Sequence, residues 1–203
     1  MTVLISQNGW VKANKGHMEM TQEIKYKDGD EEAFRFHAYS TDNICIMSDM
    51  GRVYTVPASK LPAGRGFGDP ITLMVDFEGS VSAAFTPTAQ KYLVASKGGY
   101  GFVVESSKIQ AQTKTGKQIL NLTKDDKAIF ALPAVGDKVM ASSDAGKFLI
   151  FSGLELPEMN RGKGVKLMNL KDANLEDLCM FNSFAGLGLK NESGTRDKVF
   201  TAE

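Results

Sequence analysis

The residues of this 203-residue chain best suited to chemistry are basic side chains beside glycines. Three such stretches, the basic-glycine elements, read RGFG at 65–68, KTGK at 114–117 and RGKG at 161–164. Glycine lets a backbone approach a phosphate and exposes its N–H groups, while Arg or Lys adds a charged hydrogen-bond donor. Taken singly, each is a glycine-rich turn with solvated basic residues. Three in register favour a track for a polyanion.

Catalytic motifs are scarce by comparison. The chain has two histidines, His17 and His37, and two cysteines, Cys45 and Cys179, with no HExxH, GxSxG or Walker A motif. Both cysteines stand between apolar residues, which predicts buried thiols in a reducing compartment rather than a disulfide or a metal site. GGYG at 98–101 joins two strand-like runs instead of opening a helix, so we expect a hairpin turn there and no phosphate loop. An enzyme is therefore the least favoured function class.

A repeat of about 40 to 50 residues must position the basic-glycine elements. Four times, a short apolar run ends in small or polar residues and is followed by glycine and a second apolar run; the marker glycines are Gly9, Gly51, Gly99 and Gly146. Each copy has the form of a β-hairpin. The basic-glycine elements begin 14 or 15 residues after the last three markers. The class is all-β, with the period of one blade in a propeller-like array; a β-sandwich of unrelated hairpins is the alternative.

We expect a single domain over 1–203, with repeats at roughly 3–40, 43–87, 91–132 and 138–171 and a partial one at 177–203. The partial repeat rests on a weak fifth copy, 178–181 followed by Gly186. It is either incomplete or closes the ring by pairing with the N-terminal strand. With 42% hydrophobic residues the chain can bury a core, and it has no run of about 18 apolar residues and no signal-peptide pattern. We expect no membrane-spanning segment and a cytoplasmic location.

The charge balance argues at first against nucleic acid, because 24 Lys and Arg face 24 Asp and Glu. The charges are unevenly placed, however. The windows 9–17, 52–69, 105–118 and 147–171 hold 13 of the basic and 4 of the acidic residues. A duplex within about one Debye length, roughly 8 Å, of such an edge feels the local field more than distant acids. The balance therefore allows a polyanion at this edge, and it predicts moderate, salt-sensitive contact rather than tight binding.

Three segments resemble a known family. GWVKANKGH at 9–17, GRVYTVPASKLPAGRGFGDPI at 51–71 and AGKFLIFSGLELPEMNRGKG at 145–164 are similar, in order, to the C-terminal domain of the bacterial topoisomerase IV A subunit (ParC), from about residue 3 to about residue 171. The resemblance implies a β-pinwheel of four to five blades that exchange strands, with a basic outer edge that binds and bends duplex DNA. The alternatives are a gyrase A-type DNA-wrapping domain, whose QRRGGKG box is absent here, and a propeller-like protein-interaction scaffold.

The resemblance also implies a non-catalytic region of a type II topoisomerase. The family's tyrosine nucleophile lies in a part of the protein that precedes this domain, so none of the five tyrosines is expected to inherit that role, and the chain resembles an excised C-terminal domain. No cofactor is expected in this domain, since ATP and Mg would serve other parts of the parent enzyme. The implied partners are double-stranded DNA, the ATPase B subunit (ParE) and the rest of the ParC polypeptide, at the nucleoid.

The DNA face is predicted residue by residue. Matches to the family's basic positions carry over Lys12, Lys15, Arg52, Arg65, Lys147, Arg161 and Lys163. Charge and phase in the repeat add Lys60, Lys114, Lys117 and Lys166. His17 is expected to bond a local carbonyl or to contact a phosphate. Trp10 is expected to pack within its blade rather than to stack on a base.

Overall fold

The computed structural model describes residues 1–185, 187–190 and 197–200, and confirms the all-β class. The first sheet has the order β3-β1-β2-β6. Its strands are β1 (Thr2–Ser6), β2 (Trp10–Asn14), β3 (Glu32–His37) and β6 (Asp69–Pro70). The second has the order β10-β5-β4-β7. Its strands are β4 (Asn43–Ser48), β5 (Arg52–Pro57), β7 (Val81–Phe85) and β10 (Lys117–Gln118).

The third sheet has the order β11-β8-β9-β14 and the fourth the order β13-β12-β15. Their strands are β8 (Lys91–Ser96), β9 (Tyr100–Glu105), β11 (Ala128–Pro133), β14 (Val165–Lys166), β12 (Lys138–Ser143), β13 (Phe148–Ser152) and β15 (Leu175–Phe181). A further hairpin pairs β16 (Leu187–Lys190) with β17 (Asp197–Phe200). The only helices in the described residues are single turns: η1 (Ala58–Lys60), η2 (Ile71–Leu73), α1 (Ser106–Ile109) and η3 (Gly153–Glu155).

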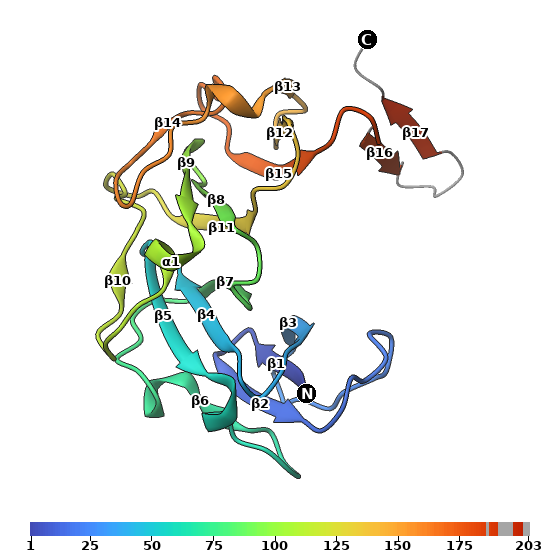
Figure 1. The fold of residues 1–203 in the computed structure, drawn as a ribbon, viewed down its shortest axis with the longest axis vertical. Coiled ribbons are helices and arrows are strands. Elements are labelled where there is room, and N and C mark those ends of the chain that lie inside the picture. Colours follow the sequence, from blue (N-terminus) through green and yellow to red (C-terminus); the bar gives the residue numbers. More distant parts are fainter. Residues whose placement is uncertain (186, 191–196, 201–203) are drawn as a thin grey trace.

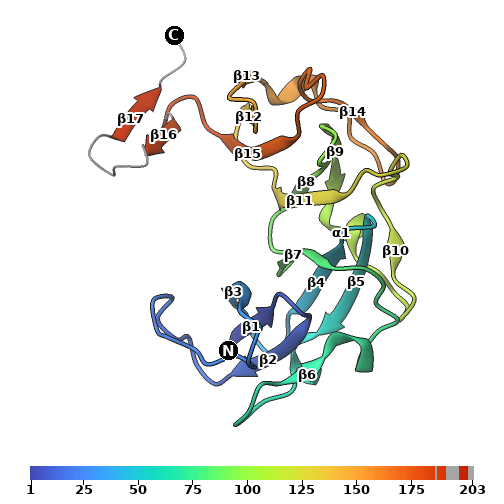
Figure 2. The same cartoon turned by 180° about the vertical axis from the view of Figure 1, so that it is seen from behind.

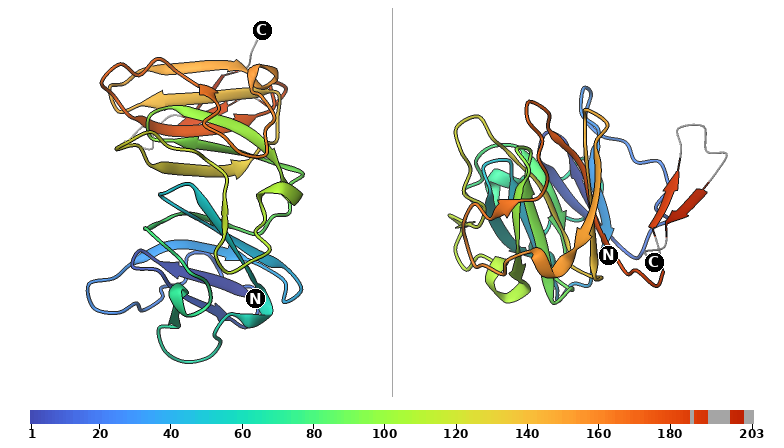
Figure 3. Two further views of the ribbon diagram at one scale, coloured as in Figure 1. Left: turned by 90° about the vertical axis from the view of Figure 1, so that its left-hand side faces the viewer. Right: turned by 90° about the horizontal axis from the view of Figure 1, so that it is seen from above.

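The four sheets follow one another in an arc (Figures 1 and 2), and β6, β10 and β14 lie along its convex outer edge. β3, β7, β11 and β15 lie on the concave side. Seen from the side, the sheets form successive layers, with the β16–β17 hairpin apart from them (Figure 3). Apolar side chains fill the space between neighbouring layers in three clusters, which include the fully buried Tyr54, Tyr92 and Phe102. No helix in the described part of the chain could span a membrane.

Each of the four sheets of the arc is built on one hairpin turn whose geometry recurs. The marker glycine donates its N–H to the carbonyl of the serine three residues earlier, at 2.9–3.0 Å in all four copies. The glycine φ angles are +80° at Gly9, +78° at Gly51, +83° at Gly99 and +76° at Gly146. This left-handed backbone suits glycine because side chains with a Cβ pay a steric penalty there. The repeat in the sequence therefore corresponds to a turn that has the same geometry in all four copies.

The outer strand of the first three sheets comes from the following repeat. β6 pairs with β2, β10 with β5 and β14 with β9, all antiparallel. The chain reaches each of these strands through a basic-glycine element. The last glycine of the third element, Gly164, has φ +80°, and a Cβ there would overlap the carbonyl oxygen of Gly101 on β9. Gly68 likewise abuts the carbonyl of Val11 on β2. These glycines are thus required for the exchange of strands.

The fourth sheet differs, because no exchanged strand covers β13 in the described residues. Phe148 and Leu149 on that edge are 47% and 40% exposed. The run 178–181, which the sequence suggested as the start of a fifth hairpin, lies in β15 and pairs with β12 as the third strand of the fourth sheet. That interpretation of the run is wrong. Both edges of β1 are taken by β2 and β3, so ring closure by pairing to β1 is also wrong.

Candidate nucleic-acid interface

The residue after each marker glycine occupies an equivalent place at the outer edge. These four residues are Trp10, Arg52, Tyr100 and Lys147. The first three lie opposite exchanged strands, as Trp10 pairs with Pro70, Arg52 with Gln118 and Tyr100 with Lys166. The backbone N–H groups of Trp10, Tyr100 and Lys147 each donate to the hydroxyl of the turn serine, at 3.0, 3.3 and 3.1 Å. The turn therefore fixes where each side chain leaves the sheet.

Three of the predicted basic residues meet in one cavity of about 670 Å³, the outer-edge groove. It is lined by Met50, Arg52, Gly116, Lys117, Gln118, Asn121, Leu122 and Arg161, none of them acidic. Arg52 Nε donates to the carbonyl of Thr115 at 2.6 Å, and Arg161 Nε donates to Asn121 Oδ1 at 3.4 Å. Strand exchange thus brings together cations from positions 52, 117 and 161. The remaining N–H groups of both guanidinium ions are free to bind phosphate oxygens.

At the first sheet, Lys12 Nζ donates to the carbonyl of Gly66 at 2.9 Å, so β2 contacts the RGFG element directly. Arg65 in that element and Lys15 just after β2 are exposed. At the other end of the arc, Lys147 is exposed beside its turn, and Lys166 is exposed on β14. Lys12, Lys15, Arg65 and Lys166 lie at or beside the places where hairpins meet exchanged segments. Lys147 occupies the corresponding turn of the fourth sheet, which has no exchanged strand in the described residues.

Lys60 and Lys114 lie elsewhere. Both line a second cavity of about 550 Å³, between the end of β5 and the segment 110–114. Neither lines the outer-edge groove. Their spacing in the repeat predicted that they lie on the same face as Arg65. The structure places them instead between the end of β5 and the segment 110–114. The structure separates the pair from the groove cations.

The cations of the predicted face form no ion pair among the described residues. The ion pairs among the described residues are Arg35–Glu32, Lys91–Glu158 and Lys127–Asp49, and none includes a predicted DNA residue. Some carboxylates cap the hairpin turns instead. Asp126 Oδ1 accepts from the N–H of Gly98 at 2.8 Å. Hydrogen bonds from Asn174 lower the pKa of Asp144. The neutral net charge of the chain therefore coexists with a basic edge.

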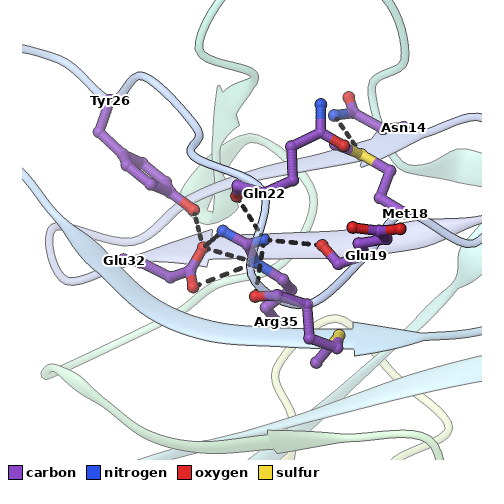
Figure 4. A network of polar contacts seen from close by, with 8 residues as sticks. Asn14, Met18, Glu19, Gln22, Tyr26, Glu32 and Arg35 are labelled. Atoms are coloured by element: carbon purple, nitrogen blue, oxygen red, sulfur yellow. Dashed lines mark hydrogen bonds and ion pairs between the residues drawn. The ribbon is translucent and has the colours of Figure 1, made fainter.

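The long segment 15–31 carries a network that the sequence did not reveal (Figure 4). Arg35 on β3 donates through Nε and Nη2 to Glu32, and through Nη1 to three carbonyls of the segment, those of Glu19, Met20 and Gln22, the last at 2.7 Å. Tyr26 donates its hydroxyl to Glu32 at 2.6 Å. Since the Arg35 side chain is only 8% exposed, it anchors the segment against the first sheet. The feature of the sequence that could have indicated this network is an Arg three residues after a Glu, at positions 35 and 32.

Protonation of Glu32 should weaken this anchor. Burial opposes ionisation of Glu32, but hydrogen bonds from Arg35 and Tyr26 outweigh it and lower its pKa. A depressed folded-state pKa gives stability that is present above the ordinary glutamate pKa and is lost as the pH falls through the folded value. We expect Glu32→Gln to destabilise the domain at neutral pH but not at strongly acidic pH, measured by urea unfolding across pH. The adjacent exposed Glu31→Gln is the control; equal pH dependence in both variants would contradict the role of Glu32.

The histidines pair with each other and not with the groove. His17 stacks on His37, with ring centroids 4.3 Å apart. His37, not His17, has a nitrogen 2.8 Å from a local carbonyl, that of Met18. The hydrogen bond to a local carbonyl that we predicted for His17 is therefore made by His37. Among the described residues, no three His, Cys, Asp or Glu side chains cluster as metal ligands.

A family model described as the DNA gyrase C-terminal domain, beta-propeller, matches residues 42–68, 90–134 and 137–174, more than half of the chain. The chain belongs to this family. The matched stretches of this gyrase-type C-terminal domain contain the first two strands of the second, third and fourth sheets and all three basic-glycine elements. The match thus covers the exchange that forms the outer-edge groove.

Within the family, the gyrase-type domain is similar to the A subunit of DNA topoisomerase 4. It is 39% identical over 199 residues to that protein of Caulobacter vibrioides, covering 97% of this chain and 26% of the relative. For Rickettsia conorii the identity is 41% over 193 residues, covering 94% and 26%. The chain thus spans about a quarter of these relatives. The resemblance drawn from the sequence is confirmed.

Solved structures agree. The Escherichia coli ParC C-terminal domain matches the gyrase-type domain with a TM-score of 0.79 and 29% identity, covering 90% of this chain and 79% of that one. A gyrase A C-terminal domain matches with a TM-score of 0.64 at 19% identity, covering 87% and 63%, and shows the fold alone. The predicted β-pinwheel is confirmed.

Proposed function

We propose that this domain binds duplex DNA along its outer edge and bends it, as the non-catalytic C-terminal part of a topoisomerase IV ParC protein. The observation that carries the proposal is the outer-edge groove, where Arg52, Lys117 and Arg161 converge without an acidic neighbour in the lining. Similarity to proteins named as the A subunit of DNA topoisomerase 4 supports the assignment to that enzyme.

The chemistry of the edge suits phosphate and not base recognition. Guanidinium and ammonium groups together with glycine N–H groups bind phosphate oxygens, and such contacts position a protein without reading sequence. The exchanged strands β6, β10 and β14 follow a convex arc (Figure 1), so a duplex that contacts several of the sheets along this edge must curve with it. Bending a site of 20 to 30 base pairs costs on the order of 1–6 kcal/mol, which additional phosphate contacts must offset.

The larger assembly is part of the same proposal. The rest of the ParC polypeptide would supply the cleavage tyrosine, and an ATPase B subunit (ParE) would supply ATP hydrolysis for strand passage, decatenation and relaxation. Mg and ATP would act in those parts. The role of this domain would be to hold a DNA segment in a defined path beside the cleavage core, at the nucleoid.

Binding of a labelled duplex should depend steeply on salt. If about five phosphates are contacted, log K falls against log salt with a slope near −4 to −5. Fluorescence anisotropy with two duplexes of unrelated sequence gives the slope and the sequence dependence, and end-to-end energy transfer on the same duplexes gives the bend. A flat salt response, or binding to one sequence alone, would contradict a phosphate-reading edge.

A further inference from the structure

The four equivalent positions after the marker glycines are two cations and two aromatic residues. Arg52 and Lys147 place their own charge at the outer edge, whereas Trp10 and Tyr100 carry none. All four residues directly follow the marker glycine of their turn. The backbone N–H groups of Trp10 and Tyr100 each donate to the hydroxyl of the serine in that turn. The first and third sheets thus lack a cation of their own at this place.

A lysine from elsewhere in the chain lies over each aromatic ring. Lys27 Nζ is 3.6 Å from the ring centroid of Trp10, and Lys163 Nζ is 3.9 Å from that of Tyr100. Lys163 comes from the RGKG element, whereas Lys27 comes from the segment 15–31, which contributes no residue to the exchanged strands. A positive charge therefore occurs at this place in all four sheets, supplied in two different ways.

An aromatic ring holds a lysine differently from a carboxylate. The negative face of the ring attracts the ammonium ion but leaves its full charge, so the same group can still bind a phosphate. An ion pair would cancel that charge. Neither lysine takes part in an ion pair among the described residues. The two rings thus position a cation without neutralising it.

Hydrogen bonds also hold the backbone turn that contains Lys27. Its carbonyl accepts from the N–H of Asp30 in a turn, at 2.9 Å. Asp30 Oδ1 in turn accepts from the N–H of Asn8, two residues before Trp10, at 3.1 Å. The neighbouring Tyr26 is bonded to Glu32, which Arg35 holds. Two of the nearby acids, Asp30 and Glu32, are therefore engaged within the protein, and the turn is ordered before any ligand arrives, which lowers the entropic cost of binding.

We propose that Lys27 is a further DNA-phosphate contact and that Trp10 is its positioning residue, as Tyr100 is for Lys163. The proposal rests on the proposed DNA-binding function and extends its face to the segment 15–31. It assigns to Trp10 the support of a cation, in place of stacking on a base. The four sheets then present four cations at one equivalent place: Lys27, Arg52, Lys163 and Lys147.

Salt titrations of duplex binding test the proposal. Lys27→Gln should make the slope shallower by about 0.9 and weaken binding about 8-fold near 0.1 M salt, as Arg52→Gln should. Trp10→Leu should weaken binding about 2- to 5-fold, the value of an exposed cation–π contact, and Trp10→Phe should restore most of that. In the Lys27→Gln background, Trp10→Leu should have no further effect, because the two residues act as one unit.

Trp10 is the only tryptophan of the chain, which gives a second readout. Its fluorescence should change on Lys27→Gln and again when duplex binds the wild-type protein. Absence of any duplex binding by the wild type would overturn the DNA-binding function itself. If the wild type binds and Arg52→Gln weakens it while Lys27→Gln does not, only the role of Lys27 is overturned. If Trp10→Leu weakens binding equally without Lys27, Trp10 acts through stacking or packing and the positioning role is wrong.

Discussion

Alanine at Gly51 should lower the free energy of unfolding by about 2 to 5 kcal/mol, whereas alanine at Gly146 should lower it by about 1 to 2 kcal/mol. Both glycines occupy the same turn position, with φ +78° and +76°. The left-handed backbone alone costs roughly 1–2 kcal/mol. At Gly51 a Cβ would also overlap the carbonyl oxygen of Leu120 just after β10, while at Gly146 it meets nothing within 4 Å. Such overpacking adds roughly 1–3 kcal/mol.

Urea unfolding followed by circular dichroism measures both losses, with the slope against denaturant compared to detect a change in cooperativity. Hydrogen exchange of residues 117–120 shows whether the strand β10 itself is released in the Gly51 variant. The pair isolates the exchanged strand, because Gly146 lies in the sheet that has no such strand among the described residues. Equal losses at the two positions would mean that β10 contributes little to the second sheet.

The double variant Arg52→Gln with Arg161→Gln should lose about 60-fold in duplex affinity near 0.1 M salt, with the salt slope shallower by about 1.8. Each phosphate contact contributes about 0.9 to the slope, and two contacts are removed from one groove. Glutamine keeps a polar side chain without the charge, and Arg161 is exposed while Arg52 is partly so. The Arg52 change removes its hydrogen bond to the Thr115 carbonyl, so urea unfolding of the double variant is measured beside its affinity. Anisotropy titrations on unrelated duplexes give the affinities and slopes.

Lys138→Gln removes the same unit of charge from the middle strand of the fourth sheet, outside the groove lining, and is the matched control. It should change the slope much less than either groove variant. A loss in the control as large as that of one groove substitution would show that total charge governs binding, not the position of the cations. A loss confined to one duplex sequence would point to base readout.

The sequence allowed the hairpins and their turns to be predicted because these features are local. A serine, a glycine three residues later and flanking apolar runs determine a turn within about ten residues. The exchanged strands escaped direct detection because β6, β10 and β14 have two residues each, too few for a period-2 pattern. Their existence was implied by the resemblance to a known family. The run 178–181 was misassigned for a similar reason. The third strand of a sheet has the same apolar composition as the first strand of a hairpin, so composition alone does not distinguish them.

The positions of the basic residues were predicted in part. Phase along the chain correctly identified the basic-glycine elements as equivalent, and the structure shows that they are where the chain crosses between sheets. The position of a residue within the repeat does not determine on which side of the sheet its side chain lies, however. Lys60 and Lys114 accordingly line a different cavity from Arg52. The position of Lys27 over Trp10 was not predicted, because it depends on how the segment 15–31 folds back against Arg35.

The basic-glycine elements are also the joints of the arc, which has a mechanical consequence. Each one links its own repeat to the sheet of the preceding repeat, so the angle between two sheets and the separation of their cations change together. Tightly fitted glycines such as Gly68 and Gly164 leave little room for such a joint to move. The curvature imposed on a bound duplex would then be set by stiff joints between sheets, and changing the number of charges would alter how tightly DNA is held without altering the path it follows.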